Sequence, residues 1–294
     1  MFRTAIEKVG NFTRPIHFIS HFYGDKNVRP GAATLFFIND QGYALTCKHV
    51  TAVIKQAADI NTNYNRFQEE KAVLQRSGSF NKKIKEIKTR YGYDKTDQAC
   101  QLLYQFVDCV DLKSVDIMEH PVYDLAILKM KDFSKRFYMG HAVFAKESKD
   151  IQPGLFLCRL GYPFPEFTNF NYDENTERIN WNSEVVRTVR FPIEGMLTRH
   201  FGDASGSIVG LEMSTPGLKG QSGGPLFDSE GIVYGMQSMT HHLHLGFDMN
   251  NQEMFSEGRR IKVSGQPLMH VGHCVHVDII KQFLREHKVE FSEG

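Results

Sequence analysis

One serine lies among glycines in a segment whose composition suits nucleophilic chemistry. In Gly220-Gln-Ser-Gly-Gly-Pro225, three glycines within five residues surround Ser222. Glycines adopt backbone conformations that other residues resist, and they keep bulky side chains away from the serine hydroxyl. Such a loop can expose a nucleophile and leave neighbouring N–H groups free to stabilise a developing oxyanion. Taken alone, the segment is equally compatible with a polar turn between two strands.

The same segment fits the G-x-S-x-G pattern of the α/β-hydrolase nucleophile elbow, which places the serine between a strand and a helix. Pro225 follows Ser222 closely and opposes a helix that begins there. An α/β-hydrolase would also need its acid and its histidine after the serine. The candidates there are Asp248, Asp278, His273 and His276. The chain that follows the serine is short for such a fold, so this alternative is disfavoured.

Two residues upstream of Ser222 have the chemistry of a base and of the group that orients it. His49 ends the segment Ala44-Leu-Thr-Cys-Lys-His49, where the chain is expected to turn. Asp124 directly precedes the apolar run Leu125-Ala-Ile-Leu128, which will tend to draw its carboxylate inward. A buried carboxylate needs a hydrogen-bond donor, and an imidazole N–H would serve. Each residue alone is more typical of a structural role.

Together these segments resemble the chymotrypsin-like (trypsin-like) serine peptidases, most closely their bacterial, high-temperature-requirement-type branch without a PDZ domain. The order His, Asp, Ser along the chain is the order of that family. Further matching segments are Thr34-Leu-Phe-Phe-Ile38, Gly161-Tyr-Pro163 and Gly231-Ile-Val-Tyr-Gly235. The resemblance implies that Ser222 is the nucleophile, His49 the general acid/base and Asp124 the group that fixes the imidazole tautomer. It also implies an oxyanion hole formed by the backbone N–H groups of Gly220 and Ser222.

The function that the resemblance implies is that of a serine endopeptidase, which hydrolyses peptide bonds through an acyl-enzyme intermediate. The expected partner is a protein or peptide substrate, and no cofactor is expected. Restricted specificity or activation by a partner is expected as well. A non-catalytic binding module of the same fold is the second hypothesis. Gln221 stands where digestive relatives have an Asp that captures a cleaved N-terminus, so activation by N-terminal clipping is not expected.

The resemblance also places the primary substrate pocket. Its expected walls are residues 215–219, residues 237–240 and a strand near Gly272. The position of trypsin's pocket-floor Asp falls on Pro216, so a preference for Arg or Lys is not supported. Leu218 and Met239 favour an apolar substrate residue. The candidate substrate-binding residues are therefore Pro216, Leu218, Ser238, Met239, Thr240 and Gly272.

The elements that must position these groups are mostly short strands. Strand patterns occur within residues 15–46 and at residues 112–117, 125–130, 155–160, 187–191, 207–211, 232–236 and 273–277, separated by turn residues. Between about 52 and 92, Lys, Glu, Gln and Ala predominate, which predicts one or two amphipathic helices. Residues 278–287 predict a C-terminal helix with Asp278 as its N-cap. The segment 241–270 is expected to be a long loop, and it or the 52–92 insertion is expected to dock a regulatory protein.

Many short strands without regular βαβ alternation favour a barrel or a sandwich over a doubly wound sheet. With the resemblance, the expected fold class is all-β: two six-stranded antiparallel β-barrels of chymotrypsin-like type, with the catalytic groups in the cleft between them. The expected domains are an N-terminal barrel with the helical insertion, residues 1–145, and a C-terminal barrel with the C-terminal helix, residues 146–294.

Composition excludes several other classes of function. The 294 residues include 35 Lys and Arg against 34 Asp and Glu, and a net charge of +1 gives no electrostatic reason to expect nucleic acid or a membrane. No stretch approaches the ~18–20 apolar residues of a membrane span. The five cysteines are odd in number and lack CxxC spacing, which favours neither disulfides nor zinc and predicts a cytoplasmic protein. The histidines at 241–244 and 270–276 lack Cys or carboxylate partners at ligand spacing, so no metal is expected.

Overall fold

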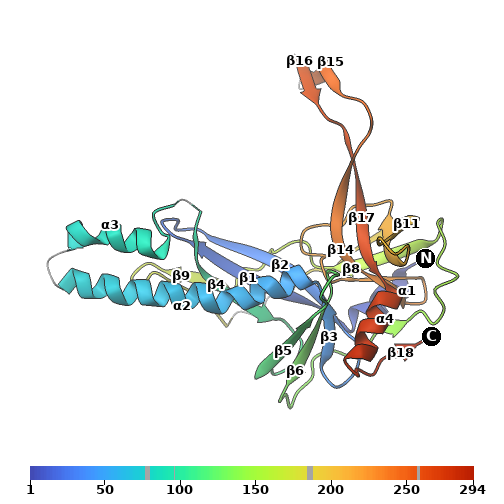
Figure 1. The fold of residues 1–294 in the computed structure, drawn as a ribbon, viewed down its shortest axis with the longest axis horizontal. Coiled ribbons are helices and arrows are strands. Elements are labelled where there is room, and N and C mark those ends of the chain that lie inside the picture. Colours follow the sequence, from blue (N-terminus) through green and yellow to red (C-terminus); the bar gives the residue numbers. More distant parts are fainter. Residues whose placement is uncertain (77–79, 96, 184–187, 257–258) are drawn as a thin grey trace.

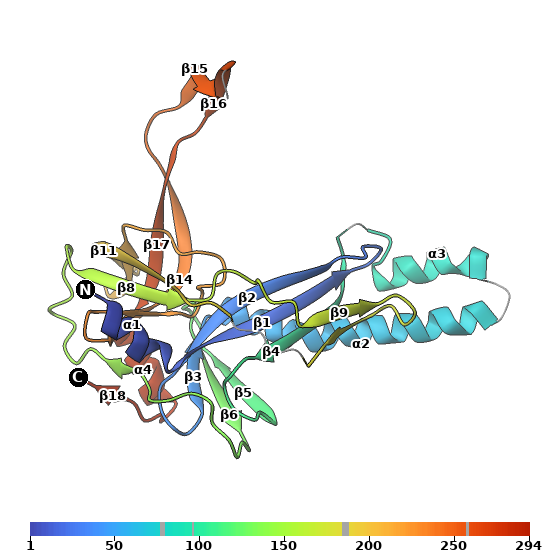
Figure 2. The same ribbon diagram turned by 180° about the vertical axis from the view of Figure 1, so that it is seen from behind.

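The computed structural model describes residues 1–76, 80–95, 97–183, 188–256 and 259–294. The described chain is mostly β, with two large sheets and two small two-stranded ones, β9–β10 (Phe170–Asp173 and Arg178–Trp181) and β15–β16 (Met249–Ser256 and Arg259–Gly265). One hydrophobic core runs from the first large sheet into the second. A helical arm and a β-hairpin project from this body in different directions (Figures 1 and 2).

The first large sheet contains six antiparallel strands in the order β4-β1-β2-β3-β6-β5. Their bounds are Thr13–Phe22 (β1), Val28–Phe37 (β2), Tyr43–Thr46 (β3), Ala99–Phe106 (β4), Ser114–Glu119 (β5) and Ala126–Lys131 (β6). The sheet is curled but open, because its edge strands β4 and β5 do not pair in the described part of the chain. The number of strands agrees with the prediction, but the predicted closure into a barrel is wrong.

A helix satisfies the edge of β4 that a closing strand would otherwise occupy. The side-chain amide of Asn61, on α2 (Lys48–Arg76), donates to the carbonyl oxygen of Leu102 at 2.8 Å and accepts from the Leu102 N–H at 3.0 Å. An exposed strand edge presents unpaired N–H and C=O groups, and a covering helix is one way to satisfy them. At Leu102 the helical insertion therefore takes the place of a pairing strand.

The insertion predicted at about 52–92 is a pair of helices, α2 and α3 (Phe80–Tyr91). The two helices form an arm: α2 runs alongside β4, and its far end projects with α3 beyond the sheets (Figure 1). α2 begins earlier than predicted, directly after β3, so its first turn belongs to the body of the protein. Where the arm meets β4, a small second core forms from Tyr64, Phe67, Ile87, Tyr93 and Cys100.

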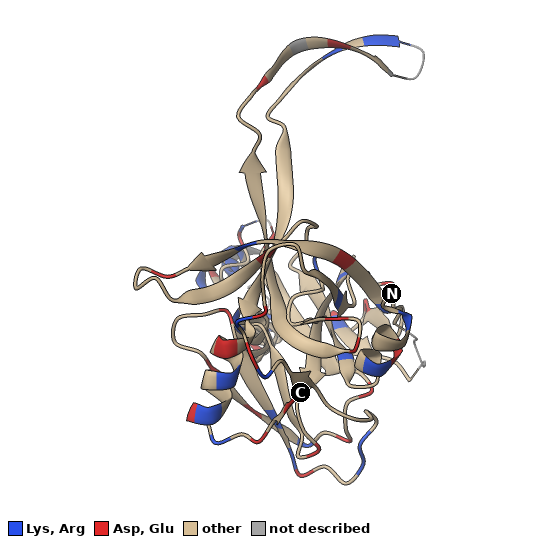
Figure 3. Ribbon diagram, turned by 90° about the vertical axis from the view of Figure 1, so that its right-hand side faces the viewer, with Lys and Arg blue, Asp and Glu red and all other residues tan. Residues whose placement is uncertain are grey.

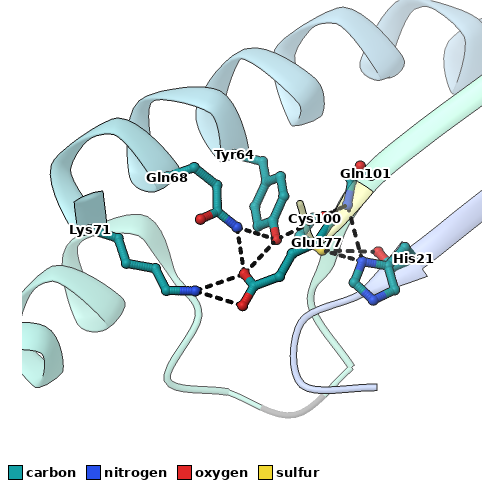
Figure 4. Close-up of polar contacts among 7 residues, drawn as sticks. All are labelled: His21, Tyr64, Gln68, Lys71, Cys100, Gln101 and Glu177. Carbon is teal, nitrogen blue, oxygen red and sulfur yellow. Dashed lines mark hydrogen bonds and ion pairs between the residues drawn. The ribbon is translucent and has the colours of Figure 1, made fainter. Parts of the chain in front are cut away.

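Glu177, in the turn between β9 and β10, ties the arm to the first sheet (Figure 4). Its carboxylate accepts hydrogen bonds from Lys71 at 2.7 Å and Gln68 at 2.6 Å, both on α2. Its carbonyl oxygen accepts from Gln101 Nε2, on β4, at 2.8 Å. Burial acts to raise the pKa of Glu177, but the hydrogen bonds from Lys71 and Gln68 outweigh it and lower the pKa. Glu177 is therefore an anion that joins three elements.

The second large sheet closes into a barrel of six strands, β13-β8-β11-β12-β17-β14, because β13 pairs with both β8 and β14. The bounds are Phe156–Gly161 (β8), Phe191–Gly202 (β11), Ile208–Met213 (β12), Pro225–Phe227 (β13), Ile232–His244 (β14) and Leu268–His276 (β17). Two short strands, β7 (Val143–Phe144) and β18 (Ser292–Glu293), extend the sheet beyond β14. This closed barrel confirms the prediction for the C-terminal half.

The segment 241–270 is predicted as a loop, but its described residues form a long β-hairpin; residues 257–258 lie outside the described chain. β14 and β17 remain paired out to His244 and Leu268, and β15 pairs with β16 beyond them. The hairpin stands out from the barrel as a narrow ribbon (Figure 3). Apolar side chains such as Phe247 and Phe255 are exposed on it. Because neither face is buried in the chain, the ribbon lacks the alternation that marks a half-buried strand.

Short helices lie at both ends of the chain, α1 (Arg3–Gly10) and α4 (Val277–Glu286). α4 confirms the predicted C-terminal helix, but its N-cap is His276, whose ring accepts from the Asp278 N–H, and not Asp278 itself. α1 was not predicted. None of the helices in the described ranges is long and apolar enough to cross a membrane.

Candidate active site

Strand pairing brings the predicted base and its orienting carboxylate together. His49 lies in the first turn of α2, directly after β3, and Asp124 lies just before β6. β3 and β6 pair with Thr46 opposite Ala126, so the two chain ends that carry these residues are adjacent. Ser222 lies in the loop before β13, and its carbonyl oxygen accepts a hydrogen bond from the N–H of Thr34 on β2 at 3.0 Å. This hydrogen bond attaches the loop before β13, in the second large sheet, to β2 of the first large sheet.

The Asp124 carboxylate uses both of its oxygens. Oδ1 accepts the backbone N–H of His49 at 2.9 Å, and Oδ2 accepts from His49 Nδ1 at 2.8 Å and from Ser238 Oγ at 2.6 Å. Burial alone would raise the pKa of Asp124, but the hydrogen bonds from His49 and Ser238 lower it to about 2. Asp124 is therefore ionised at neutral pH, and it holds the proton of the imidazole on Nδ1.

The other ring nitrogen of His49 is left available by this arrangement. The His49 side chain is 53% exposed, and its Nε2 makes no hydrogen bond with any residue that the structure describes. Ser222 Oγ donates instead to the carbonyl oxygen of Ser238 at 3.3 Å. Ser238 thus contacts both Asp124 and Ser222. A rotation of the Ser222 side chain is needed before its hydroxyl donates to His49, as is common in ligand-free sites.

The glycines around Ser222 have conformations and surroundings that exclude other residues. Gly220 and Gly223 have φ angles of +103° and +87°. A Cβ on Gly223 would lie 2.1 Å from the carbonyl oxygen of Thr34 and 2.4 Å from Thr46 Oγ1. Within the described chain, the N–H groups of Gly220 and Ser222 have no acceptor. These two donors are therefore free to bind an external oxygen atom.

Gln221 holds the serine loop from inside the protein. Its side chain is fully buried, with Nε2 donating to the carbonyl oxygen of Phe191 at 3.0 Å and Oε1 accepting from the N–H of Leu218 at 3.0 Å. Both ends of the amide are satisfied within the chain. The loop shape is thus maintained by neutral hydrogen bonds within the chain.

A cavity of about 220 Å³ adjoins Ser222. Of the six predicted substrate-binding residues, the structure places four in its wall: Leu218, Ser238, Met239 and Thr240. The remaining two, Pro216 and Gly272, lie behind the wall next to Arg159. The wall also contains Gly217, Lys219 and Gln237.

Comparisons with known proteins identify the family of this chain. The model of the trypsin-like peptidase domain matches residues 33–236, which include His49, Asp124 and Ser222. The chain belongs to the trypsin-like peptidase family. A sequence search against curated proteins finds no match.

Solved structures similar to this trypsin-like peptidase chain include HtrA-type proteases. A variant of the HtrA-type protease AlgW with a decapeptide has a TM-score of 0.48 and 13% identity, covering 98% of this chain and 68% of its own. AlgW with a tripeptide has a TM-score of 0.47 and 14% identity, covering 98% of this chain and 65% of its own. The chain thus spans about two thirds of the length of these proteins.

One group of side chains in the trypsin-like peptidase has atoms close enough to hold a metal ion. Cys47 Sγ, a His49 ring nitrogen and an Asp124 oxygen lie within 4.8 Å of one another. A cysteine ligand must be a thiolate. Burial, followed by the charge of Asp124, raises the pKa of Cys47 well above its ordinary value, and the thiol donates to the carbonyl oxygen of Gln237 at 3.2 Å. A protonated cysteine does not fit a metal site.

Two residues of the candidate site have roles that the sequence patterns do not show. Ser238 was predicted as a pocket residue, but its hydroxyl also donates to Asp124. Arg159 was not singled out, although it stands in the apolar strand Phe156–Gly161 and is fully buried. A charged residue in the middle of an apolar strand was the signal that could have found it.

Proposed function

We propose that this trypsin-like peptidase is an active serine endopeptidase that hydrolyses peptide bonds through an acyl-enzyme intermediate. Ser222 Oγ attacks the carbonyl carbon of the substrate, and His49 Nε2 takes the hydroxyl proton and later gives it to the leaving amine. Asp124 holds the imidazole and stabilises its protonated form. The N–H groups of Gly220 and Ser222 bind the oxyanion, a contribution of about 10²–10³ in turnover for one such donor.

The way in which Asp124 binds His49 carries this proposal. The carboxylate contacts both the backbone N–H and the Nδ1 of His49, at 2.9 and 2.8 Å, so it fixes the position of the residue as well as the ring. The Nε2 atom of the His49 ring makes no hydrogen bond with any described residue, and the side chain is 53% exposed, so this nitrogen is accessible to a substrate. Here that nitrogen is left for chemistry, and the hydroxyl of Ser222 lies in the same site, joined to Asp124 through Ser238.

Cleavage of a proteome-derived peptide library tests the proposal. The unmodified protein should produce new termini, and Ser222→Ala should produce none, because the alanine has no nucleophile. Ser229→Ala is the matched control, since Ser229 is exposed in the turn between β13 and β14. Cleavage by the Ser222→Ala variant at the rate of the unmodified protein would refute the assignment of the nucleophile.

We further propose that the activity is restricted by the hairpin at 241–270 or by the arm at 52–92. Met239 and Thr240 line the cavity and belong to β14, which continues without interruption into the hairpin. His49 belongs to α2, which continues into the arm. A protein bound to either extension can therefore change the position of a site residue through a continuous element. Shortening the hairpin to a tight turn after His244 should change the cleavage rate of the library if this proposal holds.

We also propose a cytoplasmic location. All five cysteines are free and buried. Free cysteines without disulfides are typical of a reducing compartment. Recovery of the native protein in the soluble cytosolic fraction of its own cells is expected, and recovery from an extracellular fraction would contradict it.

A further inference from the structure

A buried arginine lies beneath the cavity next to Ser222, and none of the proposed catalytic steps uses it. Arg159, on β8, is 0% exposed. Its Nη1 donates to Gln237 Oε1 at 2.6 Å, and its Nη2 donates to the carbonyl oxygens of Thr215 at 2.9 Å and Pro216 at 3.2 Å. Its buried Nε has no hydrogen-bond partner.

The charge of Arg159 has no counter-ion in the described chain. All of its acceptors are neutral: two carbonyl oxygens, the amide of Gln237 and the hydroxyl of Thr215. Burial lowers the pKa of Arg159, but a guanidinium keeps its proton in proteins. A buried charge without a partner is costly. It is therefore also a strong attractor for an anion that reaches it.

Gln237 connects this charge to the cavity. Its Oε1 faces Arg159, while its Nε2 lies on the other side and donates to the carbonyl oxygen of Met239 at 2.8 Å. A Cβ on Gly217, another wall residue, would lie 2.3 Å from this Nε2. Arg159 thus fixes the amide with its oxygen inward and its NH₂ group beside the cavity wall. Gln237 is one of the residues that line the cavity, and the positive charge of Arg159 lies behind its side-chain amide.

Gly272 shows that the space behind the wall is fitted to the guanidinium. A Cβ at this position would lie 2.1 Å from Arg159 Nη1 and 2.8 Å from the carbonyl oxygen of Thr215. Any larger residue would displace the charged group from its acceptors. The strand β17 therefore passes close to Arg159 only because residue 272 is glycine.

We propose that this pocket selects an acidic side chain, glutamate or aspartate, in the substrate residue that precedes the cleaved bond. The methylenes of the side chain would pack against Leu218 and Met239, and its carboxylate would accept from Gln237 Nε2 in the field of Arg159. Lys219 at the wall adds a second positive charge. Leu218 and Met239 in the wall predict an apolar substrate residue, whereas the buried charge of Arg159 favours an acidic one. The inference rests on the proposed function, since it names the substrate of the same site.

Phosphonate esters that differ only in the side chain next to the phosphorus test this selection. These probes phosphonylate an active serine, so the rate of Ser222 modification can be compared for Glu and Gln, for Asp and Asn, and for Leu and Lys. The acidic probes should react at least about tenfold faster than their amides, the effect of one hydrogen bond to a charged group. Lysine should be slowest, because the pocket repels it.

The outcomes separate this inference from the proposed function. If Ser222 reacts fastest with the Leu, Gln or Lys probe, the acidic preference is wrong and the serine peptidase assignment stands. If neither these probes nor a fluorophosphonate without a side chain modifies Ser222, the proposed function is refuted and the inference with it.

Two substitutions locate the source of the preference. Arg159→Met keeps most of the side-chain length without the charge and should reduce the ratio of the Glu rate to the Gln rate nearly to one. Lys219→Met removes an exposed charge from the wall and should reduce the ratio less, because solvent screens that charge. If Arg159→Met does not fold, the comparison of the Glu and Gln probes on the unmodified protein still tests the preference for an acidic side chain. An unchanged ratio in a folded Arg159→Met variant would contradict the role of Arg159.

Discussion

Replacing Asp124 with asparagine should destabilise the protein in a pH-dependent way. The pKa of Asp124 falls from 3.8 to about 2 because the folded protein binds its ionised form through His49 and Ser238. At about 1.36 kcal/mol for each pKa unit, this corresponds to about 2 kcal/mol in favour of the folded state when the carboxylate is ionised. Because the folded pKa is the lower one, this stabilisation is complete above the unfolded pKa and is lost as the pH falls toward the folded pKa.

Urea unfolding of the unmodified protein and Asp124→Asn, measured from pH 7 down to pH 3, tests this reasoning. The difference in the free energy of unfolding should be about 2 kcal/mol at pH 7 and should shrink as the pH falls below about 4. Acid groups that do not contact Asp124 titrate alike in both proteins and cancel in the difference. Asp116→Asn is the matched control, since Asp116 forms an exposed ion pair with Lys131. This substitution should lower the free energy of unfolding by less than about 1 kcal/mol. A difference in the free energy of unfolding that is equally large at pH 3 and pH 7 would refute the assignment of this stabilisation to the ionised carboxylate of Asp124.

Three further substitutions have expected effects on urea unfolding. Gly223→Ala should lower the free energy of unfolding by more than about 3 kcal/mol, because the φ of residue 223 is +87° and a Cβ there would lie 2.1 Å from a carbonyl oxygen. A loss below about 1 kcal/mol would contradict this prediction and show that the loop adapts. Ser238→Ala should cost about 1.5–3 kcal/mol, since it removes a hydrogen bond to a carboxylate, and an unchanged stability would contradict the importance of that bond. Glu177→Gln should cost about 1 kcal/mol, because its ion pair with Lys71 is partly screened by solvent; Glu174→Gln, in a more exposed pair, should cost less.

The candidate site was predictable from the sequence because its residues are tied to short local patterns. Ser222 is marked by its glycines, and Asp124 and His49 stand at the ends of apolar segments that become the paired strands β6 and β3. The pairing of those strands then brings the two residues together. The distances among the side chains and the position of the Ser222 hydroxyl depend on tertiary contacts, which no local pattern contains.

The features that were missed depend on contacts between distant segments. The first sheet stays open, and Asn61, in the insertion, hydrogen bonds to Leu102 on its edge strand β4; an asparagine within a helical pattern does not reveal such a contact. The hairpin at 241–270 was not recognised because its strands are exposed on both faces. Arg159 was overlooked because its acceptors on Thr215 and Gln237 lie on separate strands and loops.

Mapping the site of fluorophosphonate modification by mass spectrometry tests whether Ser222, His49 and Asp124 form one reactive centre. We expect a single adduct on Ser222, absent from Ser222→Ala, strongly slowed in His49→Ala and unchanged in Ser229→Ala. An adduct on another residue, or modification of Ser222 at the same rate in His49→Ala, would contradict the proposed chemistry.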